Sequence, residues 1–225
     1  MRVPRLPVVA CLFLSVVPAS AQVSFMDGDF SDSDWTSTLL IDTTPAPGAT
    51  FSVQQPAAGG TPGAYRETRH DYLGGSIQVA HVHGGAVADP SALGGISSVS
   101  FSYDLIHLGD DPYAVRYRLL LIQDGKVFTS VPGDLIFTGG WQSFVHAGLG
   151  ESDFVINTEL DTGTENPDFS VAGAPIQFGY RTSNYASALD PQTRISGIDN
   201  WTVVVSGGAV SVESTSWTRV KSLYR

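Results

Sequence analysis

Guanidinium and amide side chains recur at alternate positions in two otherwise apolar segments of the 225-residue chain. Arg116 and Arg118 belong to the first segment, and Gln177 and Arg181 belong to the second. Because alternate residues of a strand project from the same face, we expect each pair to share a face. Flat hydrogen-bonding groups beside an exposed aromatic ring can bind a sugar, whose C–H bonds pack on the ring. We therefore predict a ligand-binding face that contains Arg116, Arg118, Gln177 and Arg181.

Several aromatic residues could lie at the rim of this face. We place Trp141 there and keep Tyr113 and Tyr185 as alternatives. Ser102 and Asp104 alternate with apolar residues in another segment, and we expect them on the same face. The structural alternative is that Trp141 fills the core or an edge, while the arginines pair with surface carboxylates in ion pairs of little energetic worth.

Carboxylates are concentrated near the N-terminus. The chain places Asp27, Asp29, Asp32 and Asp34 within eight positions. Such a group could give several oxygens to a hard cation, and Ca²⁺ takes six to eight oxygen ligands. The spacing lacks the glycine and the distal glutamate of an EF-hand loop, which excludes that motif. The alternative is a set of acidic turn residues that binds no metal.

A second acidic group could indicate catalysis. Glu159, Asp161 and Glu165 resemble the E-x-D-x-x-E strand of laminarinase-type glycoside hydrolases, whose two catalytic carboxyl groups lie about 5–5.5 Å apart. Here the second glutamate comes one residue too late, and a shift of one residue moves a side chain to the opposite face of a strand. We therefore predict a solvated loop over these residues.

Two histidines provide a weaker hint of metal chemistry. Gly75 followed by His81 and His83 resembles the opening of the cupin motif, in which two histidines on one strand face bind a metal. The glutamate that should follow is replaced by Val87 and Ala88. The nucleophile, zinc-protease and nucleotide-binding motifs are also missing. We predict no catalytic residue, and we regard an enzyme as the less favoured class.

The first 21 residues indicate export. Arg2 and Arg5 precede an apolar run that ends in small residues, as in a secretory signal peptide, and we expect cleavage after Ala21. Cleavage would remove Cys11, the only cysteine. It would leave 10 basic residues against 22 acidic ones, a net charge of −12 with histidines neutral. This charge disfavours nucleic acids and anionic membranes as partners. No later segment has the length of a membrane span.

The elements that must position these side chains are strands. Gly and Pro contribute 24 and 13 residues, and they separate short segments in which apolar and polar residues alternate. Asp124 and Gly125 predict a two-residue hairpin turn. We predict an all-β, single-domain fold of two antiparallel sheets, a jelly-roll β-sandwich, over residues 22–206. Residues 207–225 form a C-terminal extension with a short basic tail, a candidate docking or sorting segment.

The two ends of the predicted domain carry a resemblance. The segment 25–35 (FMDGDFSDSDW) and the segment 197–205 (GIDNWTVVV) are similar to the first and last strands of jelly-roll carbohydrate-binding modules and related galactose-binding-like or concanavalin-like domains. In that family a structural calcium often joins these strands. The resemblance implies Asp27, Asp29 and Asp199 as its side-chain ligands, and no other cofactor.

Three functions remain in competition at this point. The first is an exported, non-catalytic module that binds a glycan or another cell-surface component. The second is a structural or adhesive protein of the cell envelope that binds a protein partner. The third is a polysaccharide hydrolase or lyase of concanavalin-like fold. The predicted signal peptide, the sandwich pattern and the missing catalytic motifs favour the first function. The sequence leaves the ligand and the oligomeric state open.

Overall fold

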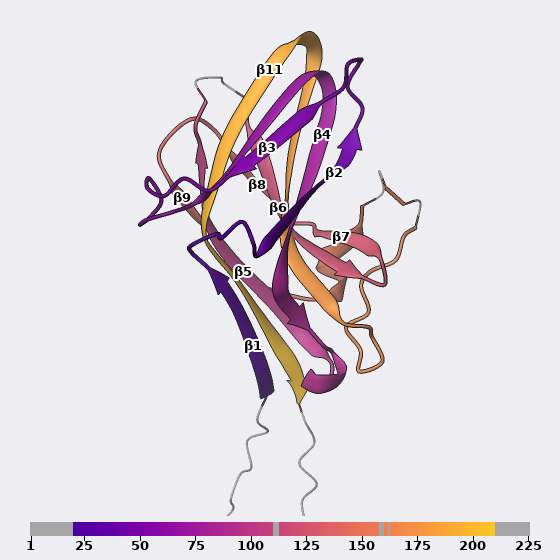
Figure 1. The fold of residues 1–225 in the computed structure, drawn as a ribbon. Helices are drawn as coiled ribbons and strands as arrows, with labels where there is room; N and C mark the ends of the chain where they lie inside the picture. Colours follow the sequence, from indigo (N-terminus) through magenta and orange to yellow (C-terminus); the bar gives the residue numbers. More distant parts are fainter. Residues whose placement is uncertain (1–19, 110–112, 158–159, 162, 210–225) are drawn as a thin grey trace, which may run out of the picture.

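The computed structural model describes residues 20–109, 113–157, 160–161 and 163–209 (Figure 1). The described residues form strands joined by turns, with two short 3₁₀ helices. The strands are β1 (Ser20–Asp27), β2 (Trp35–Asp42), β3 (Thr50–Gln54), β4 (Arg66–Ala88), β5 (Ile96–His107), β6 (Val115–Gln123), β7 (Lys126–Ser130), β8 (Asp134–Ile136), β9 (Gln142–Leu149), β10 (Phe154–Ile156) and β11 (Ile176–Ala209). The helices are η1 (Ser91–Leu93) and η2 (Glu151–Asp153).

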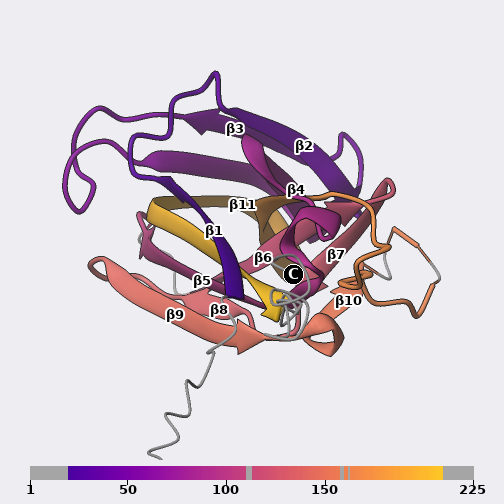
Figure 2. The same cartoon turned by 90° about the horizontal axis from the view of Figure 1, so that it is seen from below.

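Two strands, β4 and β11, run through both layers of the molecule. The first sheet has the order β2, residues 76–88 of β4, residues 176–186 of β11, β6, β7 and β10, with β8 also beside β6. The second sheet contains β3, residues 66–73 of β4, residues 191–209 of β11, β5 and β9, and β1 pairs with the end of β11. All these pairs are antiparallel, and Figure 2 shows the layers from below.

The two long strands turn over side by side at one tip of the molecule (Figure 1). In β4 the turn is made by Gly74 and Gly75, whose φ angles are +68° and +70°. A Cβ atom on Gly75 would lie 2.6 Å from the carbonyl oxygen of Thr43. Glycine is therefore required here both for the left-handed backbone and for the close approach of the chain.

The main core lies between the two sheets. Contacts across the gap join Phe25 to Phe178 and Tyr103 to Tyr117, with ring centroids 5.9 and 6.4 Å apart. Trp201 is fully buried and meets the edge of another tryptophan ring from β2 at 5.1 Å. These residues come from the apolar positions of the alternating segments. The prediction of an all-β, single-domain, antiparallel jelly-roll sandwich is confirmed.

A polar layer divides this core from a smaller apolar cluster at the tip, formed by Tyr72, Ile77 and Val79. In this layer His70 Nδ1 donates to the amide oxygen of Asn184 (2.7 Å), which joins the second sheet to the first. His81, fully buried, lies within hydrogen-bonding distance of hydroxyl groups on both neighbouring strands. His70 and His81 are thus structural residues of the sandwich interior.

Some boundaries differ from those predicted. The turn at Asp124 joins β6 to β7 as expected, with φ +51° at Asp124. β11 continues to Ala209, beyond the predicted domain end at 206. The predicted signal peptide, except Ser20 and Ala21, and the tail from 210 onward lie outside the described residues. The described part of the chain contains no helix that is long and apolar enough to cross a membrane.

Candidate ligand-binding cavity

The outer face of the first sheet carries a row of polar side chains. Because of strand alternation, Tyr117 and Tyr180 face the core, while Arg116, Arg118 and Arg181 face outward. Arg118 lies directly opposite Arg181 in the antiparallel register. Three of the predicted ligand-binding residues are therefore brought together, as the spacing indicated.

These arginines line a cavity of about 770 Å³. That volume is in the range of about 300–1,000 Å³ found for small-molecule sites. Most lining residues lie on β4, β6 and β11, here called the floor, and others lie on β7, β8 and β10 or directly after β10, here called the sides. The lining side chains that hold most of the polar groups are Gln78, Arg116, Arg118, Thr129, Asn157, Arg181 and Ser183.

Arg181 is the most buried of the three arginines, with 6% of its surface exposed. Its Nη1 donates to Gln78 Oε1 (2.9 Å), and the same oxygen accepts from Asn157 Nδ2 (3.2 Å). Gln78 therefore holds the guanidinium of Arg181 and connects it to Asn157. Sequence reasoning missed Gln78 and Asn157: Gln78 sits in an alternating segment that could have indicated it, whereas no pattern marks Asn157.

Arg118 is half-buried and Arg116 is exposed. Burial, and then the positive charge of Arg116, lower the pKa of Arg118. Room for Arg118 depends on Gly133, because a Cβ atom there would lie 2.7 Å from Arg118 Cγ. Neither of these two arginines forms an ion pair with a carboxylate of the residues that the structure describes.

An exposed aromatic ring stands at the rim. Tyr185 is 69% exposed, and it lines both the arginine cavity and a neighbouring hollow of about 190 Å³. Tyr113 and Gln192 lie in that second hollow. The guanidinium of Arg194 packs on the ring of Tyr113, 4.7 Å from its centroid. Tyr185, a predicted alternative to Trp141, therefore lies at the rim of the cavity.

Two other predicted members of the face do not line the cavity. Trp141 donates from Nε1 to the carbonyl oxygen of Gly59 (2.9 Å) and packs against Tyr65, outside the residues that line the cavity. Gln177 shares the strand of Arg181 but donates to the carbonyl oxygen of His83, and it does not line the cavity either. Trp141 and Gln177 therefore lie outside the cavity that the arginines line, and their part in ligand binding stays a prediction.

Ser102 and Asp104 also depart from the expected face, because their strand β5 belongs to the second sheet. Asp104 accepts hydrogen bonds from Asn200 Nδ2 (2.7 Å) and Thr61 Oγ1 (2.8 Å). Alternation predicted that these side chains point away from the core, but it could not indicate which of the two sheets carries them.

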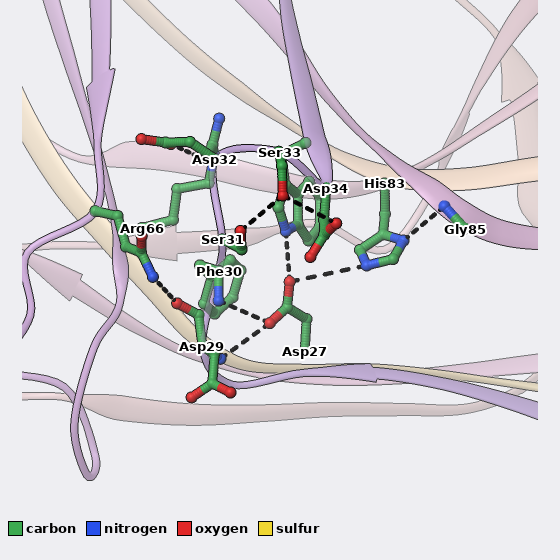
Figure 3. A network of polar contacts seen from close by, with 12 residues as sticks. Asp27, Asp29, Phe30, Ser31, Asp32, Ser33, Asp34, Arg66, His83 and Gly85 are labelled. Atoms are coloured by element: carbon green, nitrogen blue, oxygen red, sulfur yellow. Dashed lines mark hydrogen bonds and ion pairs between the residues drawn. The ribbon is translucent and has the colours of Figure 1, made fainter.

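The acidic N-terminal segment forms a hydrogen-bonded turn (Figure 3). Asp27 Oδ1 accepts from the backbone N–H groups of Asp29 (2.9 Å) and Phe30 (2.7 Å). Asp27 Oδ2 accepts from Trp35 Nε1 (2.6 Å) and lies 3.8 Å from His83 Nε2. Both oxygens of Asp27 are thus engaged within the protein.

The predicted calcium ligands do not fit one ion as they stand here. Asp199 lies opposite Asp104, and its carboxylate accepts from the backbone of Thr61 and of Asn200 (2.7 Å for Asn200). Asp29 is exposed. Among the described residues, no three His, Cys, Asp or Glu side chains gather as a metal site. Calcium binding by Asp27, Asp29 and Asp199 stays a prediction of the sequence.

The histidines and carboxylates that resemble catalytic or metal-binding motifs have other contacts where the structure describes them. His81 faces the core, whereas His83 Nδ1 accepts from the backbone N–H of Gly85 (3.1 Å). Glu165 is exposed and forms an ion pair with Lys126 (2.9 Å). Glu159 lies outside the described residues.

Comparison with known proteins gives matches in structure alone. No protein family and no curated protein matches the sequence. A family 11 carbohydrate-binding module from Clostridium thermocellum, in complex with a β-1,3-1,4-mixed-linked tetrasaccharide, is 14% identical with a TM-score of 0.46, over 80% of this chain and 94% of that one. A carbohydrate-binding module from the β-sandwich superfamily is 12% identical with a TM-score of 0.43, over 82% and 74%. A module that recognises mannan is 11% identical with a TM-score of 0.37, over 82% and 98%.

Proposed function

We propose that this chain is an exported, non-catalytic module that binds an oligosaccharide in the arginine cavity of the first sheet. The observation that carries the proposal is the exposed ring of Tyr185 beside Arg116, Arg118 and Arg181. A sugar offers one face of C–H groups and a rim of hydroxyl groups. An aromatic ring and flat guanidinium groups match these two features. Export is supported by the N-terminal sequence, which resembles a signal peptide.

The arrangement of the side chains suits binding by a preformed site. Gln78 holds Arg181 in place through a buried hydrogen bond, so little side-chain freedom is lost when a ligand arrives. The floor lies on paired strands, which position their side chains more firmly than loops do. The hydroxyl and amide groups of Thr129, Ser183 and Asn157 add further hydrogen-bonding partners.

Tyr185 also indicates the length of the ligand. Its ring lies between the arginine cavity and the smaller hollow, because it lines both. A chain of several sugar units could place one unit in each hollow and pass across the ring. We therefore propose that the module binds within an extended polysaccharide chain and does not bind only a terminal sugar.

Titration calorimetry against a panel of β-glucan, mannan, galactan and polyuronate oligosaccharides tests the proposal. We expect at least one class to bind, and Tyr185→Ala to weaken that binding by about tenfold or more. Phe137→Ala is the matched control, because Phe137 is also an exposed aromatic residue, at 54%, but does not line the cavity. Absence of binding to the whole panel, or equal effects of the two substitutions, would contradict the proposal.

A further inference from the structure

We infer that the ligand of the arginine cavity is an anionic glycan, with carboxylate or sulfate groups along its chain. This inference rests on the proposed function and adds the chemical class of the sugar. Three of the 12 basic residues of the chain line this one cavity. The chain has 22 acidic residues, yet none of the described residues that line the cavity is acidic. The described lining of the cavity thus carries three positive charges and no negative one, in a protein of net charge −10.

The three arginines lie close to one another in the sheet. Arg118 and Arg181 are directly opposed across two antiparallel strands. Arg116 lies two residues from Arg118 on the same face. The pKa of Arg118 is lowered first by burial and then by repulsion from the positive charge of Arg116. A bound anion would remove this repulsion.

The guanidinium groups of β6 are also available to a ligand. Elsewhere in the described structure, Arg66 pairs with Asp32 (2.9 Å) and Arg69 pairs with Asp71 (2.7 Å). Arg116 and Arg118 have no such carboxylate among the described residues. Arginine binds carboxylate and sulfate-like groups through two parallel N–H donors, which is stronger than a bond between neutral groups. Two guanidinium groups without a described carboxylate partner, in one cavity, therefore fit an anion better than they fit a neutral hydroxyl group.

The rest of the surface would increase selectivity for this site. A protein with a large acidic excess repels polyanions over most of its surface, and a cationic concave site concentrates the field. An anionic chain should then bind in the cavity alone. Tyr185 at the rim distinguishes this site from a simple anion site, because its ring can pack on the sugar that carries the charge.

The test compares charged oligosaccharides with their neutral counterparts. Oligogalacturonate is titrated beside its methyl ester, and a sulfated galactan oligosaccharide beside its desulfated form, so that the two sources of negative charge are separated. We expect one charged member to bind at least about tenfold more tightly than its neutral counterpart, and to lose affinity as salt is raised. Arg116→Gln and Arg118→Gln should each weaken binding about tenfold or more. Arg69→Gln, in the second sheet, should leave it unchanged.

The outcomes separate this inference from the proposed function. One outcome would overturn the anionic ligand but keep the proposed glycan-binding function. In it, charged and neutral oligosaccharides bind equally well, Tyr185→Ala weakens binding, and the two arginine variants bind like the wild type. Absence of binding to any charged or neutral oligosaccharide would overturn both. Thermal melting verifies that each variant is folded. Arg116→Gln is less apt to disturb folding than Arg118→Gln, because Arg116 is exposed and Arg118 is half-buried.

Discussion

Arg118 of β6 and Arg181 of β11 face each other across neighbouring strands, yet only Arg181 is held by a hydrogen bond to Gln78. One guanidinium is thus fixed in the floor, while the other lies against Gly133 with its Nε buried and without a partner. A fixed donor and an adjustable donor would let the cavity accept an anionic group at slightly different positions along a chain. The pair is therefore the centre of the proposed site.

Relief of the charge crowding should stabilise the unliganded protein. We expect Arg116→Gln to raise the free energy of unfolding by about 0.2–0.5 kcal/mol at low salt, because it removes a positive charge next to Arg118. In 0.5 M salt the difference should shrink, since screening weakens the repulsion. Urea unfolding at both salt concentrations measures the effect. A destabilised variant at low salt would show that the arginines do not repel one another significantly.

The carboxylate of Asp27 should stabilise the protein through hydrogen bonds. It accepts from two backbone N–H groups and from the indole of Trp35, a residue that is 5% exposed. Asp27→Ala leaves these donors without a partner, so we expect a loss of about 2 kcal/mol. Asp27→Asn keeps one acceptor oxygen and should lose less. Chemical denaturation measures both variants.

Melting of the wild type and of Asp27→Ala in excess calcium and in excess chelator tests the predicted calcium site. If the hydrogen bonds of Asp27 account for its role, the effect of Asp27→Ala is the same in excess calcium and in excess chelator. A wild-type melting temperature that falls in chelator, while that of Asp27→Ala does not, would instead place a stabilising cation at this carboxylate.

The buried histidines predict acid sensitivity. Burial lowers the pKa of His70 to about 4, and burial lowers the pKa of His81 well below its usual value of 6.5. The unfolded chain then binds protons more readily than the folded one between pH 6.5 and 4. Stability should therefore be complete above about pH 6.5 and decrease as the pH falls through this window, by up to about 3 kcal/mol for His70.

Unfolding measurements at pH 7, 5.5 and 4.5 test this prediction. His70→Gln keeps a hydrogen-bonding side chain toward Asn184 but does not titrate, so its stability should fall less steeply than that of the wild type. Parallel pH profiles for the wild type and the variant would contradict a role of His70.

The turn of β4 should tolerate no side chain. We expect Gly75→Ala to destabilise the protein by more than Gly125→Ala, by at least about 1 kcal/mol. Both glycines have positive φ angles, +70° and +75°, but a Cβ on Gly125 meets no atom within 4 Å. The comparison therefore isolates the close approach to Thr43. Equal losses in thermal unfolding would attribute the whole effect to backbone conformation.

Strand alternation was enough to predict which side chains face away from the core. Arg116, Arg118 and Arg181 meet because β6 and β11 are neighbours whose register places Arg118 opposite Arg181, and alternation had put all three on outward faces. It failed for Asp104, since sheet membership depends on long-range pairing that local pattern does not contain. Trp141 was misplaced for a similar reason: its partner Gly59 is far away in sequence.

The acidic ends illustrate another limit of sequence reasoning. The chain pairs β1 with the end of β11, as expected for first and last strands, with Asp27 opposite Trp201. The carboxylates themselves are directed by local turns: Asp27 binds the N–H groups two and three residues ahead. A short polar side chain near a turn commonly bonds its own backbone, and this local bond is invisible in residue spacing alone.

The passage of β4 and β11 through both sheets joins the two layers into one unfolding unit. Because the two layers share the backbones of β4 and β11, we expect them to unfold together. Amide protons in β5 and β6 should accordingly exchange with solvent at nearly the same free energy. A ligand that bridges β6 and β11 on the first sheet would then slow exchange in β5 as well, although β5 lies in the opposite layer.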